Sequence, residues 1–162
     1  MFAVSGAARD LVAEDFGIGW KDIEVIPNGV DTDRFSPRTE PRSDGPLVIG
    51  ASGRLHPIKN FPLILEAVAK LPDALPPVEV HYAGEGPGRT DIERTAERLG
   101  LTKQVKLLGH VDDVPAFLRS LDVFVLSSDN EANPNALLEA LSTGLPCVST
   151  AVGGAVEVTH HG

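Results

Sequence analysis

The sequence predicts an α/β protein in which a parallel β-sheet carries helices on both faces. Short apolar runs and amphipathic segments alternate about every 25 residues from residue 47 onward, as expected of strand–helix–strand units. The apolar runs are nearly continuous, which is typical of strands that are buried on both faces. Right-handed crossovers between such parallel strands place helices on both sides of the sheet.

Size and charge narrow the possible classes of protein. The chain has 162 residues, with 14 Lys and Arg against 23 Asp and Glu, and a formal net charge of −9. This length suits one domain, or one and a fraction, and can bury a real core. The negative charge argues against nucleic acid or an anionic membrane surface as the main partner, because both attract basic patches.

Targeting and redox signals are absent from the sequence. No apolar run approaches the ~18–20 residues that cross a bilayer, and charged residues interrupt positions 1–15, where a signal peptide would need an apolar region. The single cysteine, Cys147, excludes an intrachain disulfide and a Cys-rich zinc site. We therefore expect a cytoplasmic protein.

Two short elements precede the alternation. A helix is predicted over 5–16, with Ser5 as its N-cap and Gly17 at its end. A strand over 23–26 leads into a Pro-Asn-Gly turn, and the polar, proline-rich residues 36–46 form a loop or linker.

The alternating part supplies the remaining elements. Asn60 can cap the first helix, Thr90 with Glu93 has the spacing of a capping box for the second, and Asp112 or Asp113 can cap the third. The sequence predicts strands over 47–52, 78–83, 105–108, 122–126 and 147–150, and helices over 61–70, 91–99, 114–120 and 135–143.

Ligands of such sheets lie beyond the carboxyl ends of the strands, so the loops after the strands are the places to look for a site. The loop over 53–60 carries Arg54 and Lys59 ahead of a helix. A guanidinium fork, an ammonium and backbone N–H groups suit a diphosphate, although two solvated loop cations are the alternative. No P-loop pattern is present.

The later loops offer further candidate residues. The glycines that begin at Gly84 allow a ligand close to the backbone, or only a tight turn. Backbone around Val111 could form a flat shelf for a base. Glu131 lies in a loop and Glu139 follows eight positions later in an otherwise apolar helix. Glu139 is therefore either exposed on the outer face or kept near the crevice, where a carboxylate could accept both hydroxyls of a cis-diol.

At these residues the chain resembles retaining GT-B glycosyltransferases of the group 1 (family 4) type. Each block of the resemblance is weak by itself, but their common order is specific. The blocks are Ile26-Pro27-Asn28-Gly29-Val30-Asp31, Gly53-Arg54-Leu55 with Lys59-Asn60, Gly84-Glu85-Gly86-Pro87, Glu131-x7-Glu139, Gly144-Leu145-Pro146 and Gly153-Gly154-x-x-Glu157.

The resemblance implies a Rossmann-like, nucleotide-sugar donor-binding domain that is the C-terminal half of such an enzyme. It implies that Arg54 and Lys59 hold the donor diphosphate, that Glu139 binds the ribose, and that Glu131 faces the transferred sugar. It also implies transfer with retention of configuration and no divalent metal. We expect Arg54, Lys59 and Glu131 as catalytic residues, and as donor-binding residues Gly53, Gly84, Val111, Asn135, Ala136, Leu137 and Glu139.

Two departures from the family pattern bear on function. The family commonly has Glu-Gly-Phe where this chain has Glu131-Ala132-Asn133, so the identity of the sugar is left open. We expect residues 1–45 to be an interdomain junction and linker, and residues 46–162 to be the donor-binding domain, truncated at its C-terminal end. The N-terminal domain with the acceptor site would then be missing, and the truncated edge could self-associate.

Two other classes compete with a transferase. A dinucleotide-binding oxidoreductase domain has a similar sheet, but the G-x-G-x-x-G fingerprint is absent. A truncated, non-catalytic module that binds a nucleotide or a partner is the other alternative.

Overall fold

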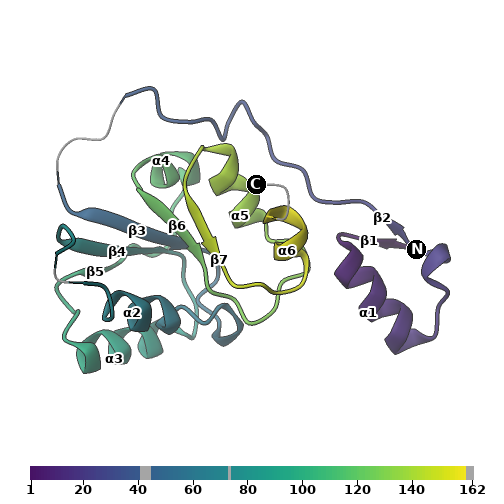
Figure 1. The fold of residues 1–162 in the computed structure, drawn as a ribbon, viewed down its shortest axis with the longest axis horizontal. Helices are drawn as coiled ribbons and strands as arrows, with labels where there is room; N and C mark the ends of the chain where they lie inside the picture. Colours follow the sequence, from purple (N-terminus) through teal and green to yellow (C-terminus); the bar gives the residue numbers. More distant parts are fainter. Residues whose placement is uncertain (41–44, 73, 160–162) are drawn as a thin grey trace.

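The structure is a computed structural model that describes residues 1–40, 45–72 and 74–159. The predicted linker over 36–46 includes residues 41–44, and the predicted domain over 46–162 includes 73 and 160–162; these lie outside the described residues. An all-parallel, five-stranded sheet with strand order β5-β4-β3-β6-β7 forms the centre of the molecule (Figure 1). The predicted fold class is thereby confirmed.

The five strands and four helices predicted for the alternating part are all present, and α6 is an additional helix. The strands are β3 (Leu47–Ser52), β4 (Val78–Ala83), β5 (Val105–Leu107), β6 (Val123–Leu126) and β7 (Cys147–Ser149). The helices after them are α2 (Pro62–Val68), α3 (Arg89–Leu99), α4 (Val114–Arg119), α5 (Asn135–Ser142) and α6 (Gly154–Thr159).

Two hydrophobic clusters hold the layers together, one on each face of the sheet. Helices α2 and α3 pack side by side on one face, where Leu65, Tyr82 and Ile92 are fully buried (Figure 1). Helices α4 and α5 cover the other face, with Phe124 and Leu137 in its core. Burial on both faces explains why the strand sequences are apolar at nearly every position.

Successive strands are added toward one edge of the sheet from β3 to β5 and toward the other edge from β6 to β7. The two sets meet where β3 pairs with β6, at Ile49 with Val123 and at Gly50 with Phe124. Gly50 leaves room there for the fully buried side chain of Leu121. A Cβ atom at position 50 would lie 2.4 Å from both terminal methyl groups of Leu121. The absence of a side chain at this position therefore permits the two halves of the sheet to meet.

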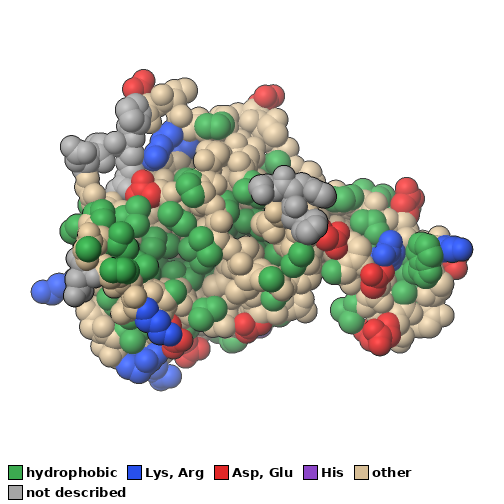
Figure 2. Space-filling view, viewed as in Figure 1, with side chains coloured by type: hydrophobic (Ala, Val, Ile, Leu, Met, Phe, Trp, Pro, Cys, Tyr) green, Lys and Arg blue, Asp and Glu red, His purple; other side chains and the backbone are tan. Residues whose placement is uncertain are grey.

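Residues 1–26 form a small lobe beside the sheet domain (Figure 2). It contains β1 (Phe2–Ala3), α1 (Gly6–Phe16), the 3₁₀ turn η1 (Trp20–Asp22) and β2 (Glu24–Val25), and the two strands pair in parallel. The expected caps of α1 are present: Ser5 Oγ accepts a hydrogen bond from the N–H of Ala8 (3.1 Å), and Gly17 ends the helix in a left-handed conformation. No residue of α1 is buried.

Element boundaries differ from the prediction where local turns intervene. A one-turn 3₁₀ helix, η2 (Pro57–Lys59), precedes α2, and Asn60 adopts a left-handed φ of 45° between the two. Helix α3 begins at Arg89, ahead of the expected capping box, and Glu93 instead pairs with Arg89. Helix α6 and strand β1 were not predicted. None of the helices among the described residues is both long and apolar enough to span a bilayer.

Candidate active site

A cavity of about 650 Å³ opens at the carboxyl edge of the sheet. Its walls come from the loops after β3, β4, β5 and β6 and from the first turns of α4 and α5, at the place where open parallel sheets bind ligands. Nine of the ten predicted site residues line it: Gly53, Arg54, Lys59, Gly84, Val111, Glu131, Asn135, Ala136 and Glu139. The topology thus brings together residues that are far apart in sequence.

Glycines allow the ends of β3 and β4 to approach closely below the cavity. The N–H of Gly53 donates to the carbonyl of Ala83 (2.9 Å), and the N–H of Gly84 donates to the carbonyl of Gly109 (2.7 Å). Gly84 has a φ of 145°, and a Cβ atom on it would lie 1.9 Å from the carbonyl oxygen of Gly53. Only glycine fits at position 84, so the cavity has a floor of backbone atoms.

Two of the predicted catalytic residues contact each other. The ammonium of Lys59 lies 2.6 Å from Glu131 Oε1, and Ser128 Oγ donates to the same oxygen at 2.6 Å. The hydroxyl of Ser127 donates to the carbonyl of Lys59 (2.7 Å), which fixes the end of η2 against the loop after β6. The cation and the carboxylate therefore stand at one point of the cavity wall.

Arg54 stands apart from this pair. Its side chain is exposed, and it makes no ion pair or side-chain hydrogen bond with any residue that the structure describes. Its guanidinium donors are consequently available to an anion that enters the cavity.

Glu139 lies on the cavity wall rather than on the outer face of α5. Burial raises the pKa of Glu139 above its ordinary value of 4.5, and the positive charge of Arg34 opposes that rise. A partly buried carboxylate with little local compensation is a good acceptor for paired hydroxyl groups.

Leu137 departs from the expectation. Its side chain is fully buried in the hydrophobic cluster under α5, and the cavity wall does not include it. Positions 137 and 139 differ by roughly 200° around the helix axis, so Leu137 faces the core when Glu139 faces the cavity. The side chain of Leu137 supports α5 and does not reach the site.

Other lining residues were not predicted. Asn133 and His110 lie on the wall, and Val114 extends the apolar stretch that begins at Val111. The side chain of Asn133 donates to the carbonyl of Val4 at 2.6 Å, across 129 positions of sequence. No local sequence pattern predicts a contact between residues so far apart. Among the described residues, no cluster of three or more His, Cys, Asp or Glu could hold a metal ion.

The parallel sheet and the cavity at its carboxyl edge define a Rossmann-like domain of the kind found as the C-terminal half of GT-B glycosyltransferases. Residues 33–162 match the family described as glycosyl transferases group 1, and the chain belongs to that family.

The sequence similarity to named glycosyltransferases extends over most of the chain. It is 36% identical over 137 residues to the lipopolysaccharide core biosynthesis glycosyltransferase LpsE of Rhizobium meliloti, covering 82% of this chain and 39% of LpsE. It is 37% identical over 159 residues to the UDP-Gal:alpha-D-GlcNAc-diphosphoundecaprenol alpha-1,3-galactosyltransferase of Escherichia coli, covering 90% of this chain and 41% of that enzyme.

Solved structures show the same architecture. The crystal structure of Anabaena Alr3699/HepE in complex with UDP and glucose superposes with a TM-score of 0.87 and 26% identity, over 99% of this chain and 47% of HepE. The chain therefore spans less than half the length of the relatives that it matches.

Proposed function

We propose that the chain is the donor-binding half of a glycosyltransferase that moves a sugar from a nucleoside-diphosphate sugar to an acceptor with retention of configuration. The observation that carries this proposal is that Arg54, Lys59, Glu131 and Glu139 all face one cavity. Two cations and a half-buried carboxylate match the diphosphate and the ribose of a nucleotide. The relative solved with UDP and glucose supports the same type of ligand.

Each residue has a separate role in the proposed reaction. Arg54 and Lys59 bind the diphosphate and stabilise the charge that develops on it when its bond to the anomeric carbon breaks. Glu139 accepts hydrogen bonds from the ribose hydroxyls, and the apolar stretch at Val111 faces the base. Glu131 faces the transferred sugar. As in the family-4 enzymes that the sequence resembles, no resident metal is required.

The domain division follows from this function. Residues 1–45 form the junction with an acceptor-binding domain, and residues 46–162 bind the donor. Transfer needs the donor and the acceptor held together in a cleft that excludes water. The isolated chain supplies one wall of such a cleft, so we expect it to bind a nucleotide without useful turnover. The exposed Val148 on the edge strand β7 offers a surface for self-association.

Calorimetric titration with uridine, UDP and UDP-glucose tests the assigned roles. Arg54→Ala should lower the affinity for UDP by about 10–100-fold, because it removes charge-assisted hydrogen bonds worth ~1.5–3 kcal/mol. The affinity for uridine should not change, because uridine has no phosphate. Glu139→Ala should weaken uridine and UDP by the same factor, because both carry the ribose. Glu131→Ala should lower the affinity for UDP-glucose relative to the affinity for UDP.

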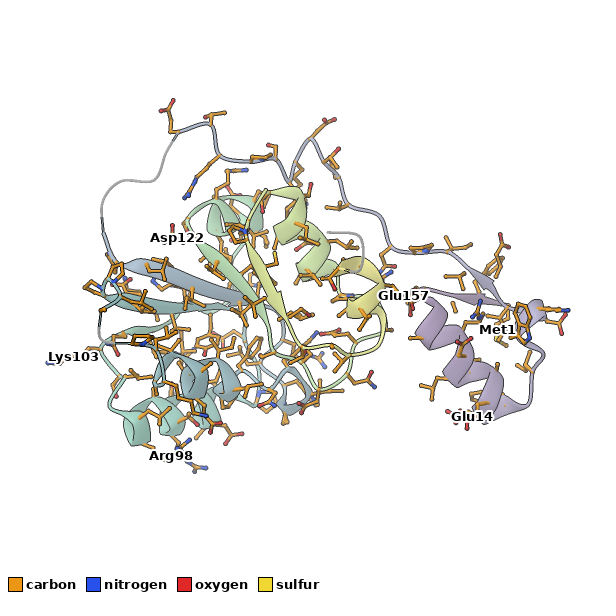
Figure 3. The ribbon with its side chains drawn as sticks, in the orientation of Figure 1. Met1, Glu14, Arg98, Lys103, Asp122 and Glu157 are labelled. Atoms are coloured by element: carbon orange, nitrogen blue, oxygen red, sulfur yellow. The ribbon has the colours of Figure 1, made fainter. Side chains whose placement is uncertain are left out.

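A matched control is Arg98→Ala. Arg98, labelled in Figure 3, is an exposed arginine that pairs with Glu66 and does not line the cavity. The Arg98→Ala variant should bind all three ligands like the wild type. An equal loss of affinity for all three ligands in Arg54→Ala would contradict the proposed role of Arg54. Unchanged affinity for these ligands in Glu139→Ala would contradict the proposed role of Glu139.

A further inference from the structure

Hydrogen bonds of three side chains join the N-terminal lobe, and Asn28 just after it, to the sheet domain. The side chains are Asn28, Asn133 and Glu157, and we call this group the polar bridge. Asn133 lines the cavity, whereas Asn28 and Glu157 lie outside it. None of the three has a role in the function proposed above.

Glu157 fastens the first turn of α1 to α6. Its two carboxylate oxygens accept hydrogen bonds from the N–H groups of Gly6 (2.9 Å) and Ala7 (2.8 Å). Figure 3 shows Glu157 on α6, on the side that faces the lobe. A carboxylate at a helix N-terminus satisfies unpaired N–H groups and the helix dipole together. The carboxylate of Glu157 thus joins the lobe to the sheet domain.

The two asparagines connect the cavity wall to the lobe and to the segment that directly follows the lobe. Asn133 donates from Nδ2 to the carbonyl of Val4 (2.6 Å). Asn28 donates from Nδ2 to the carbonyl of Asn133 (3.1 Å) and to Oδ1 of Asn135 (2.7 Å). Asn133 and Asn135 both line the cavity, so Val4 of the lobe and Asn28 together hold the segment that follows Glu131.

A close backbone contact completes the connection between α6 and this loop. The N–H of Gly154, the first residue of α6, donates to the carbonyl of Glu131 at 2.9 Å. A Cβ atom on Gly154 would lie 1.9 Å from the carbonyl oxygen of Ala132 and 3.1 Å from Cβ of Ser5. The Glu131 loop is therefore enclosed between α6 and the start of α1.

We propose that Glu157, Asn133 and Asn28 are positioning residues that set the Glu131 loop, and with it the part of the cavity that meets the sugar. The inference rests on the proposed function and extends it. Arg54 lies on a different loop and Glu139 on α5, which the core supports. The polar bridge should therefore affect the binding of the sugar more than that of the nucleotide. By linkage, a sugar that fits the loop should also strengthen the docking of α1.

Glu157→Ala is the first test, with UDP and UDP-glucose as ligands. We expect the affinity for UDP to stay within about 2-fold of the wild-type value. The ratio of UDP-glucose affinity to UDP affinity should fall by about 10-fold, corresponding to about 1.4 kcal/mol. Glu157→Gln keeps one oxygen acceptor, so its affinity ratio should lie between those of the wild type and Glu157→Ala. Glu14→Ala, on the exposed surface of the same lobe, is the matched control and should leave the ratio unchanged.

A second measurement follows the loop without any ligand. The backbone amide NMR signals of Ala132 and Asn133 should shift in Glu157→Ala and remain in place in Glu14→Ala. Asn28→Ala removes the hydrogen bonds of Asn28 to Asn133 and Asn135, and it should shift the amide signals of Ala132 and Asn133 as well. Unchanged signals in both bridge variants, or an equal loss of UDP and UDP-glucose binding, would overturn the proposal. A wild-type chain that does not bind UDP would instead refute the proposed function, because the amide signals report on the bridge independently.

Discussion

Breaking the ion pair between Lys59 and Glu131 should change stability and nucleotide affinity in opposite directions. The side chains are 26% and 11% exposed, and their charged atoms are 2.6 Å apart. Such burial lies between that of surface pairs, worth ~0.2–1 kcal/mol, and of fully buried pairs, whose disruption costs ~3–5 kcal/mol. Glu131→Gln keeps an oxygen for Ser128, so it should lower the free energy of unfolding by about 1–2 kcal/mol.

The same substitution should strengthen the binding of UDP. In the wild type, Lys59 must leave or share its carboxylate partner when it meets a diphosphate. In Glu131→Gln that competition is removed, and the affinity for UDP should rise by up to about 10-fold, whereas UDP-glucose should gain less because the proposed sugar contact is altered. Urea unfolding with and without UDP, together with calorimetric titration, measures both effects.

The double-mutant cycle with Lys59→Met separates the pair from its surroundings. If the two side chains act together, the double variant should be less destabilised than the sum of the single variants by about 1 kcal/mol or more. A Glu131→Gln variant that binds UDP more weakly than the wild type, or a strictly additive cycle, would refute this reasoning.

Three further outcomes are expected. Burial raises the pKa of Glu139, so the affinity for UDP should fall as the pH is lowered through that raised pKa, whereas Glu139→Gln should lack this dependence in pH titrations. The sign for stability is opposite: the folded chain binds this proton more tightly than the unfolded chain, so Glu139 makes a stabilising contribution at low pH that is lost as the pH rises. Tyr82→Phe removes the 3.1 Å hydrogen bond to the carbonyl of Phe61 and should cost about 1–2 kcal/mol in denaturant unfolding. Gly84→Ala places a methyl group against the carbonyl of Gly53 and should lower both the melting temperature and the affinity for UDP.

The sequence predicted helix α1 and the sheet domain because each of their signals acts locally. Apolar runs of strand length, and Ser5 and Asp113 as N-caps, depend on residues within a few positions, and both caps form. The loops that follow parallel strands necessarily share one edge of the sheet, so the gathering of Arg54, Lys59 and Glu139 at one cavity could also be predicted.

The rest depends on contacts that no spacing encodes. Lys59 and Glu131 are 72 positions apart, and Gly6 and Glu157 are 151 apart. Leu137 was misplaced because α5 is apolar around most of its circumference, and composition does not show which side faces the sheet. Helix α6 has only six residues and begins at a glycine, so neither a cap nor periodicity marks it.

The seam at Gly50 has a mechanical consequence for the whole domain. The sheet consists of two sets of parallel strands that extend toward opposite edges, and the hydrogen bonds between β3 and β6 join the two sets. A methyl group at position 50 would overlap the buried side chain of Leu121, so that side chain or the neighbouring strand would have to shift. The cavity straddles this seam, with Arg54 on one half and Glu131 on the other. A substitution at position 50 should therefore alter the separation of Arg54 and Glu131, although neither Gly50 nor Leu121 lines the cavity.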